Sequence, residues 1–204
     1  MLLAINYCIK RLNTGSPGFV REALELYRLS LAEGSMLEDG VFPESTFNNI
    51  FTLAVKLEEY EWANEFVLNN QQFLKPVFRE PMYFYCLGKL SFEQDEYDKS
   101  LQYLAKLETK AHFLFLGAKT IQLKIFYEQK EIDLLQTSLE SLRIYLQRRK
   151  DLGYRKSNYE NLIYFVRKLL EKETMNRTDK DNFIEEVNAA EILTEKEWLI
   201  NQMG

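Results

Sequence analysis

Large apolar residues recur every three or four positions along most of this chain, which is the spacing of amphipathic helices. The pattern is strongest between positions 84 and 107, where large residues surround one glycine and one serine: Phe84, Leu87, Gly88, Phe92, Tyr97, Ser100, Leu104 and Leu107. A glycine inside a helix costs about 1 kcal/mol relative to alanine. The segment therefore predicts two helices that approach closely because Gly88 and Ser100 are small.

The same pattern recurs on both sides of this segment. The residue that opens the second helix of each predicted hairpin is Val20, Tyr60, Tyr97 or Ile132, at separations of 40, 37 and 35. Small residues occupy the matching position of three second helices, namely Ala23, Ala63 and Ser100. These separations favour a repeat array of helical hairpins over unrelated amphipathic helices.

The periodicity and its interruptions predict an all-α fold. Helices are expected near 1–12, 18–33, 44–57, 60–74, 81–93, 97–108, 112–129, 132–150, 157–172 and 178–203. Turns are expected at 14–18, at Lys75–Pro76 together with Pro81, and at 94–96. We expect an α-solenoid of stacked antiparallel helix hairpins, with about four repeats in 1–150 and C-terminal capping helices in 151–204 of the same continuous array.

These residues resemble the tetratricopeptide repeat, a helical hairpin with a period of about 34 residues. The resemblance covers roughly residues 18–145 and is strongest in the third hairpin. The chain departs from the family at Glu58, Asp95 and Lys130, where the family usually has a turn glycine. In its overall sequence character the chain also resembles tetratricopeptide-like proteins of Bacteroidetes bacteria. This resemblance implies no particular activity.

The resemblance implies a binding groove lined by the first helices of successive hairpins. The register places eight candidates there: Asn48, Thr52, Tyr85, Lys89, Phe92, Thr120, Lys124 and Tyr127. Aromatic, amide and lysine side chains can hold an extended peptide by stacking and by pairing with its carboxylates. The alternative is a wall of the stack that binds nothing tightly. We expect a protein or peptide partner and a scaffold function.

Charge is unevenly distributed along the chain, whose formal net charge is −5. The segment 143–168 contains eight basic and two acidic residues. Six of the basic residues are candidates for a basic patch: Arg143, Arg148, Arg149, Lys150, Arg155 and Lys156. This segment, with its interleaved tyrosines, suits a nucleic-acid or signalling adaptor. A solvated helix face or an interface to an acidic protein is the favoured explanation, because the acidic character of the whole chain opposes nucleic-acid binding.

Acidic residues gather at two equivalent predicted turns. One group is Glu58, Glu59 and Glu61, and the other is Glu93, Asp95, Glu96 and Asp98. Carboxylates near a helix start interact favourably with its positive end. We expect both groups to lie along one edge of the stack.

The chain offers few groups for catalysis. His112 is the only histidine, and it opens an apolar run for which a helix-start or packing role is expected. Cys8 and Cys86 lie in apolar helical stretches, so we expect buried thiols in a reducing cytoplasm. The sequence indicates neither an enzyme nor a cofactor, and no apolar run is long enough to span a bilayer. The abrupt helical start suits either a complete chain or the C-terminal part of a longer protein.

Overall fold

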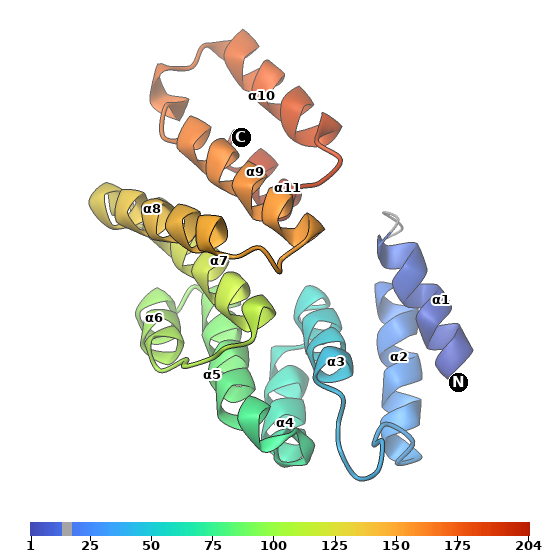
Figure 1. The fold of residues 1–204 in the computed structure, drawn as a ribbon. Helices are drawn as coiled ribbons and strands as arrows, with labels where there is room; N and C mark the ends of the chain where they lie inside the picture. Colours follow the sequence, from blue (N-terminus) through green and yellow to red (C-terminus); the bar gives the residue numbers. More distant parts are fainter. Residues whose placement is uncertain (14–17) are drawn as a thin grey trace. The chain divides into compact units, whose positions relative to one another are not determined.

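The computed structural model describes residues 1–13 and 18–204, and in these residues the fold is all-helical with no strand. The chain divides into two compact units, Met1–Ile125 and Phe126–Gly204, which we describe separately. The first unit holds α1 (Leu2–Asn13), α2 (Phe19–Ala32), α3 (Glu44–Lys56), α4 (Tyr60–Asn70), α5 (Pro76–Glu93), α6 (Tyr97–Ala105) and most of α7 (His112–Glu128) (Figure 1). The second unit holds α8 (Ile132–Arg148), α9 (Tyr154–Leu169), α10 (Arg177–Ala189) and α11 (Lys196–Asn201).

The helix positions confirm most of the periodicity, with three corrections. Helix α5 begins at Pro76 instead of 81, and Pro81 lies inside it. Near the start of a helix a proline removes only one main-chain hydrogen bond, so the helix continues through it. Helix α4 ends at Asn70 and a short 3₁₀ turn follows. The helix expected at 178–203 is two helices, separated where Glu195 adopts a left-handed conformation.

The expected turn at 14–18 lies largely outside the described residues. The division at Ile125 also differs from the expected boundary at 150/151. Helix α8 packs on α9, which places it in the same unit as the C-terminal helices.

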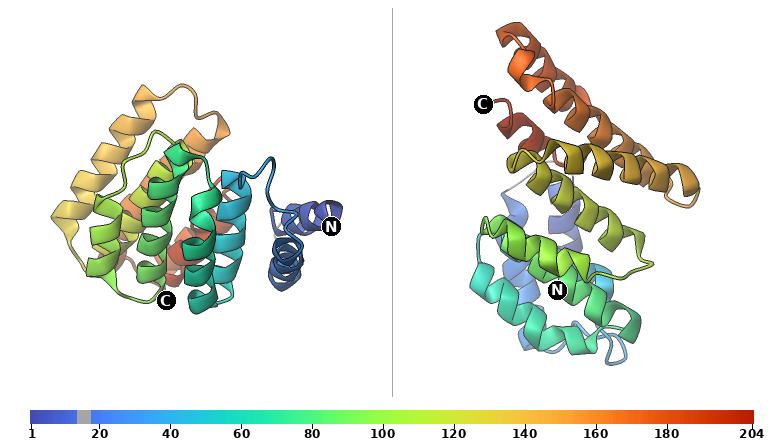
Figure 2. Two further views of the ribbon diagram at one scale, coloured as in Figure 1. Left: turned by 90° about the horizontal axis from the view of Figure 1, so that it is seen from below. Right: turned by 90° about the vertical axis from the view of Figure 1, so that its left-hand side faces the viewer.

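Consecutive helices of the first unit pack as neighbours. Contacts join α1 to α2, α2 to α3, α3 to α4, α4 to α5 and α5 to α6, and Figure 2 shows α3 to α6 lying side by side. Phe47, Ile50 and Phe51 of α3 are fully buried in a core that continues from Ile5 to Ile125. The burial of these large side chains is the main source of stability for the unit.

The closest approach between helices is the one that the sequence predicts at Gly88. A Cβ atom at this position would lie 2.6 Å from Leu104 Cδ2, which is shorter than a van der Waals contact. The hydroxyl of Ser100 on α6 donates a hydrogen bond of 2.7 Å to the Gly88 carbonyl. Both small residues are therefore needed for α5 and α6 to pack as they do.

Three helix–turn–helix connections share one backbone geometry. Non-glycine residues with positive φ occupy the turns after α3, α5 and α7, namely Glu58 (59°), Asp95 (59°) and Lys130 (58°). In the first turn, the Glu59 N–H donates to the Ala54 carbonyl and the Glu58 N–H to the Val55 carbonyl, each at 3.0 Å. The other two turns make the same pair of bonds at 2.8–3.1 Å, which is the Schellman pattern of a helix end.

These turns lie at the positions where the sequence departs from the turn glycine. The backbone conformation that favours glycine is kept without it, so each turn retains its shape at a conformational cost. The three connections thus share one backbone geometry and one hydrogen-bond pattern.

Helix α2 is tied to the first of these turns by a charged cluster. The guanidinium of Arg28 lies 4.4 Å from the centre of the Trp62 ring and forms ion pairs with Glu25 and Glu59. Arg21 also pairs with Glu59, at 3.3 Å. The carboxylate of Glu59 is therefore neutralised by two arginines.

The second unit has its own apolar core. Leu135, Leu139 and Leu142 bury one face of α8, and Phe165 of α9 meets Phe183 of α10 edge to face at 5.6 Å. Trp198 of α11 donates to the carboxylate of Glu128 at 2.7 Å. The C-terminal helices thus fold on side chains of their own unit.

Candidate functional site

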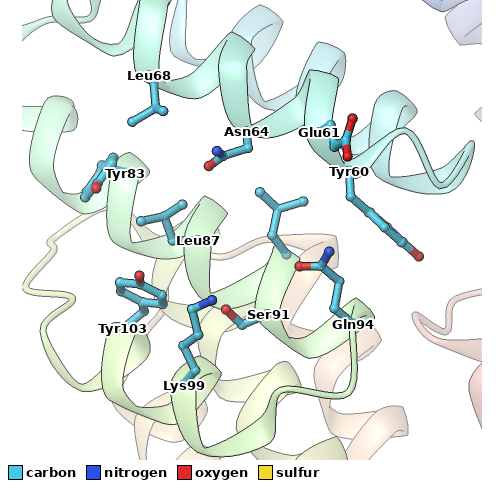
Figure 3. A pocket seen from close by; sticks show the side chains of 11 residues that line it. Tyr60, Glu61, Asn64, Leu68, Tyr83, Leu87, Ser91, Gln94, Lys99 and Tyr103 are labelled. Atoms are coloured by element: carbon cyan, nitrogen blue, oxygen red, sulfur yellow. The ribbon is translucent and has the colours of Figure 1, made fainter.

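A groove of about 410 Å³ lies on the first unit among α4, α5 and α6. Figure 3 shows Tyr83 and Tyr103 at one end, Leu87 in the middle and Tyr60 at the other end. Its eleven lining residues are Tyr60, Glu61, Asn64, Leu68, Tyr83, Leu87, Leu90, Ser91, Gln94, Lys99 and Tyr103. Three aromatic rings and two amide side chains thus surround one opening.

Helical spacing explains which residues of α5 and of the turn after it line the groove. Tyr83, Leu87 and Gln94 follow one another at intervals of four and seven residues, which places them on one face of the helix. Leu90 and Ser91 lie on the same face and are buried, so they form the floor. Gly88 lies next to this face, where α5 packs against Leu104 of α6.

The rim of the groove is exposed and partly charged. Leu68 on α4 is 48% exposed although it is a large apolar residue. Lys99 on α6 is paired with Glu96 at 2.7 Å, and the hydrogen bond from this pair raises the pKa of Lys99. The rim therefore offers an apolar contact, while the charge of Lys99 is balanced by a neighbour.

The Tyr60 end of the groove is acidic. Burial raises the pKa of the Tyr60 hydroxyl, and the negative charges of Glu93, Glu58 and Asp95 raise it further. These carboxylates belong to the end of α5 and to the turns after α3 and α5, and Glu61 is the one carboxylate in the groove lining itself. The two acidic turn groups expected along one edge do lie near each other at this tyrosine.

The eight groove candidates from the sequence lie elsewhere, on the first helices of the hairpins. The structure brings these helices together, since α3 packs on α5 and a Cβ atom at Gly117 of α7 would lie 2.8 Å from the Tyr85 ring. Lys124 of α7 lies over the Phe92 ring at 4.8 Å. The expected adjacency of α3, α5 and α7 is therefore present in the first unit.

Three of the eight candidates are packing residues. Tyr85, Phe92 and Thr120 are at most 9% exposed, and the Thr120 hydroxyl donates to the Leu116 carbonyl at 2.9 Å. Their register is as expected, but their side chains fill space between helices and leave almost no surface for a peptide. This is a correction to their expected role as ligand contacts.

The other five candidates are half-buried: Asn48, Thr52, Lys89, Lys124 and Tyr127. Tyr127 belongs to the second unit, where its ring meets Trp198 edge to face at 5.6 Å. All eight candidates are described residues, and the α4–α5–α6 groove is lined by none of them. Sequence periodicity missed the groove, to which α4 contributes Tyr60 and the exposed Leu68 and α6 contributes Tyr103.

The basic patch expected on the second unit is partly neutralised. Arg143 donates to Glu140 at 2.8 Å, and this hydrogen bonding holds the pKa of Glu140 below its ordinary value. Lys156 lies 3.8 Å from Glu160, and the Arg149 guanidinium lies over the Tyr145 ring. Arg148, Lys150 and Arg155 are exposed.

Two further basic residues of the 143–168 segment pair with carboxylates outside it. Arg167 lies 3.6 Å from Glu140, and Lys168 lies 2.7 Å from Glu186. The positive charge of the segment is therefore smaller in the structure than in the sequence.

The two cysteines and the histidine, the remaining candidates for chemistry, occupy positions expected of residues with a structural role. Cys8 and Cys86 are free and buried, as expected, and burial raises the pKa of the Cys86 thiol. His112 opens α7, which confirms its expected place at a helix start. Among residues 1–13 and 18–204, no cluster of histidine, cysteine and acidic side chains is suited to a metal ion.

A second cavity of about 660 Å³ lies between the start of α5 and the connection from α6 to α7. Val77 and Phe78 line one side, and residues 108–111 line the other. Most of its wall is a short connection, in contrast to the three helices around the first groove. We therefore take the α4–α5–α6 groove as the candidate site.

No family model, curated protein or solved structure matches this chain. In the part of the chain that the structure describes, none of the helices combines the length and apolar character needed to cross a bilayer. The resemblance to tetratricopeptide repeats thus stays a prediction.

Proposed function

We propose that this protein is a non-enzymatic cytoplasmic scaffold that binds an extended segment of a partner protein in the α4–α5–α6 groove. The observation that carries the proposal is the lining of this groove by Tyr60, Tyr83 and Tyr103 around Leu87. Tyrosines supply a large contact area with little loss of side-chain entropy, and amides adapt their hydrogen bonds to different partners. Asn64 and Gln94 supply such amides here.

The positions of these groups suit a main chain that lacks hydrogen-bond partners of its own. An extended segment presents carbonyl and N–H groups along its length, and the tyrosine hydroxyls and amides can bond to both. The helices that hold them are fixed by the Gly88 contact and by the buried core. A lining held on helices favours a preformed site, which lowers the entropy lost on binding.

A tetratricopeptide-like α-solenoid belongs to the same proposal. It is supported by the three equal turns and by the small residues at Ala63 and Ser100, both fully buried. In this arrangement the groove lies between the second helices of two successive hairpins. The face formed by the first helices, where sequence analysis placed the groove, then serves mainly for packing.

Leu68 provides the sharpest test because it lines the groove and is exposed. Peptides selected from a library of random linear sequences on the immobilised protein would be labelled and measured by fluorescence anisotropy. We expect Leu68→Glu to weaken their binding about tenfold or more. Leu29→Glu is the matched control, since Leu29 of α2 is 54% exposed and lies outside the groove. Equal binding by both variants and the wild type would refute the groove as the site.

The alternative function, a nucleic-acid or signalling adaptor, involves Arg148, Arg149 and Lys150 at the end of α8. Its test is retention on immobilised nucleic acid with and without charge reversal at these three positions. Retention that falls steeply with salt and disappears in the reversed variant would favour the adaptor. The ion pairs of Arg143, Arg167 and Lys168 reduce the charge available for this role.

A further inference from the structure

We infer that the groove takes a segment carrying a lysine or arginine, and that this cation lies at the Tyr60 end. The inference depends on the proposed function, because it names the chemistry of the segment that the groove would bind. It is carried by the difference in charge between the two ends of one groove. The groove provides the binding site, and the negative charge at one of its ends favours a segment with a cationic side chain.

The carboxylate of Glu61 lines the groove beside Tyr60, and the negative charges of Glu58, Glu93 and Asp95 act on the Tyr60 hydroxyl from the adjoining turns. Glu58, Glu61 and Glu93 form no ion pair with any residue in the described part of the chain, and Asp95 accepts a hydrogen bond of 3.1 Å from the Tyr97 hydroxyl. The adjacent Glu59 differs, because Arg21 and Arg28 neutralise it. The negative charge at this end is therefore available to a ligand.

The aromatic ring of Tyr60 adds a second attraction for a cation. Tyr60 is half-buried and lines the groove, so its ring can meet a side chain that enters there. Lysine and arginine bind to tyrosine faces by cation–π attraction, and their aliphatic stems can pack on Leu90 and Leu87 along the way. A carboxylate at the same place would be repelled by Glu61 and by the nearby turn carboxylates.

The opposite end does not show this charge. Tyr83 and Tyr103 lie there with Leu87, and the nearby Lys99 is balanced by Glu96. A segment in the groove therefore meets an aromatic, neutral end and an acidic end. This polarity favours one direction of binding for a segment with a single basic residue.

The test uses three pools of labelled random linear peptides that differ at one fixed position. The first pool has arginine there, the second has its neutral analogue citrulline, and the third has glutamate. We expect the arginine pool to bind about three- to tenfold more tightly than the citrulline pool. The glutamate pool should bind most weakly, and the preference should shrink as salt is added.

Two double variants locate the effect on the protein. Glu61→Gln with Glu93→Gln should remove most of the preference for arginine, measured within the variant as the ratio of arginine-pool to citrulline-pool affinity. Glu22→Gln with Glu33→Gln changes exposed carboxylates of the α2 region outside the groove and should leave the preference intact.

The outcomes separate the inference from the proposed function. Equal binding of all three pools, abolished by Leu68→Glu, would overturn the inference and leave the groove as a peptide site. No binding of any pool would overturn both. Self-association that Leu68→Glu abolishes and that excludes the peptides would make a second copy of this chain the occupant, which also overturns the inference.

Discussion

Ser100 and Gly88 form the central contact of the first unit. The Ser100 hydroxyl donates a hydrogen bond of 2.7 Å to the Gly88 carbonyl, and a Cβ atom at Gly88 would lie 2.6 Å from Leu104. The hydrogen bond and the missing side chain act at the same place on two helices. They set the separation of α5 and α6, and these two helices carry six of the eleven residues around the groove.

Replacing Ser100 by alanine should lower the free energy of unfolding by about 1 kcal/mol. The buried hydrogen bond is lost, and the higher helix propensity of alanine offsets part of that loss. Urea denaturation followed by circular dichroism measures the change. Ser141→Ala on the exposed side of α8 is the control, and it should be neutral or slightly stabilising. An equal response of the two variants would show that the Ser100 bond contributes nothing.

Gly88→Leu should destabilise the protein by roughly 1–3 kcal/mol, because the added side chain overpacks the contact with Leu104. The measurement is the denaturant midpoint at constant slope. Glu80→Leu places the same side chain at an exposed position of α5 and should change stability by no more than about 0.5 kcal/mol. Unchanged stability of Gly88→Leu would contradict the observed packing.

Glycine at the three equal turns should stabilise the protein. Glu58, Asp95 and Lys130 each hold a positive φ that costs a side-chain-bearing residue about 1–2 kcal/mol, while glycine loses more entropy on folding. We expect a gain of about 0.5–1 kcal/mol for each substitution, measured by thermal and denaturant unfolding. Gln102→Gly, at an exposed helical position of α6, should instead cost about 1 kcal/mol. A loss of stability at all three turns would argue against this backbone geometry.

The thiols of Cys8 and Cys86 should be inert in the folded protein. Both are buried, and burial raises the pKa of Cys86, so little thiolate is present. Alkylation by iodoacetamide should be about a hundredfold or more slower than in denaturant, because it requires local opening. Cys8→Ser and Cys86→Ser variants assign the rate to each thiol. Rapid labelling of the native protein would show that the site is open to solvent.

Glu140 should titrate below its ordinary pKa of 4.5, chiefly because Arg143 donates hydrogen bonds to its charged form. A carboxyl whose folded-state pKa is lowered stabilises the fold above its unfolded-state pKa. That contribution disappears as the pH falls through the folded-state value. Carbon-detected NMR titration measures the shift, and Arg143→Gln should move the pKa of Glu140 upward. A pKa unaffected by this substitution would show that the pair does not persist in solution.

Much of the helical structure could be predicted because its signals are local. Apolar spacing gave the second helices that begin at Tyr60, Tyr97 and Ile132, and the structure starts helices at these residues. Gly88 was also informative, since a costly glycine inside a helix needs a close neighbour to explain it. The start of α5 was less predictable, because a proline near a helix start disturbs too few hydrogen bonds to stop it.

The groove could not be predicted in the same way. Tyr85 and Phe92 have the same residue types as groove aromatics, yet the packing of α7 and α6 covers them. Tyr83, on the same helix, lines the opening instead. A single helix shows which of its faces is apolar, but it does not show which of them a neighbour will cover.

The sequence by itself determined most of the helices, the spacing of the helix starts at Tyr60, Tyr97 and Ile132, and the close contact at Gly88, because each depends on residues near one another along the chain or on one missing side chain. The tertiary structure decided which aromatic residues remain accessible and which carboxylates meet at Tyr60. These depend on the relative placement of helices far apart in sequence, and burial and electrostatic interaction act through space rather than along the chain.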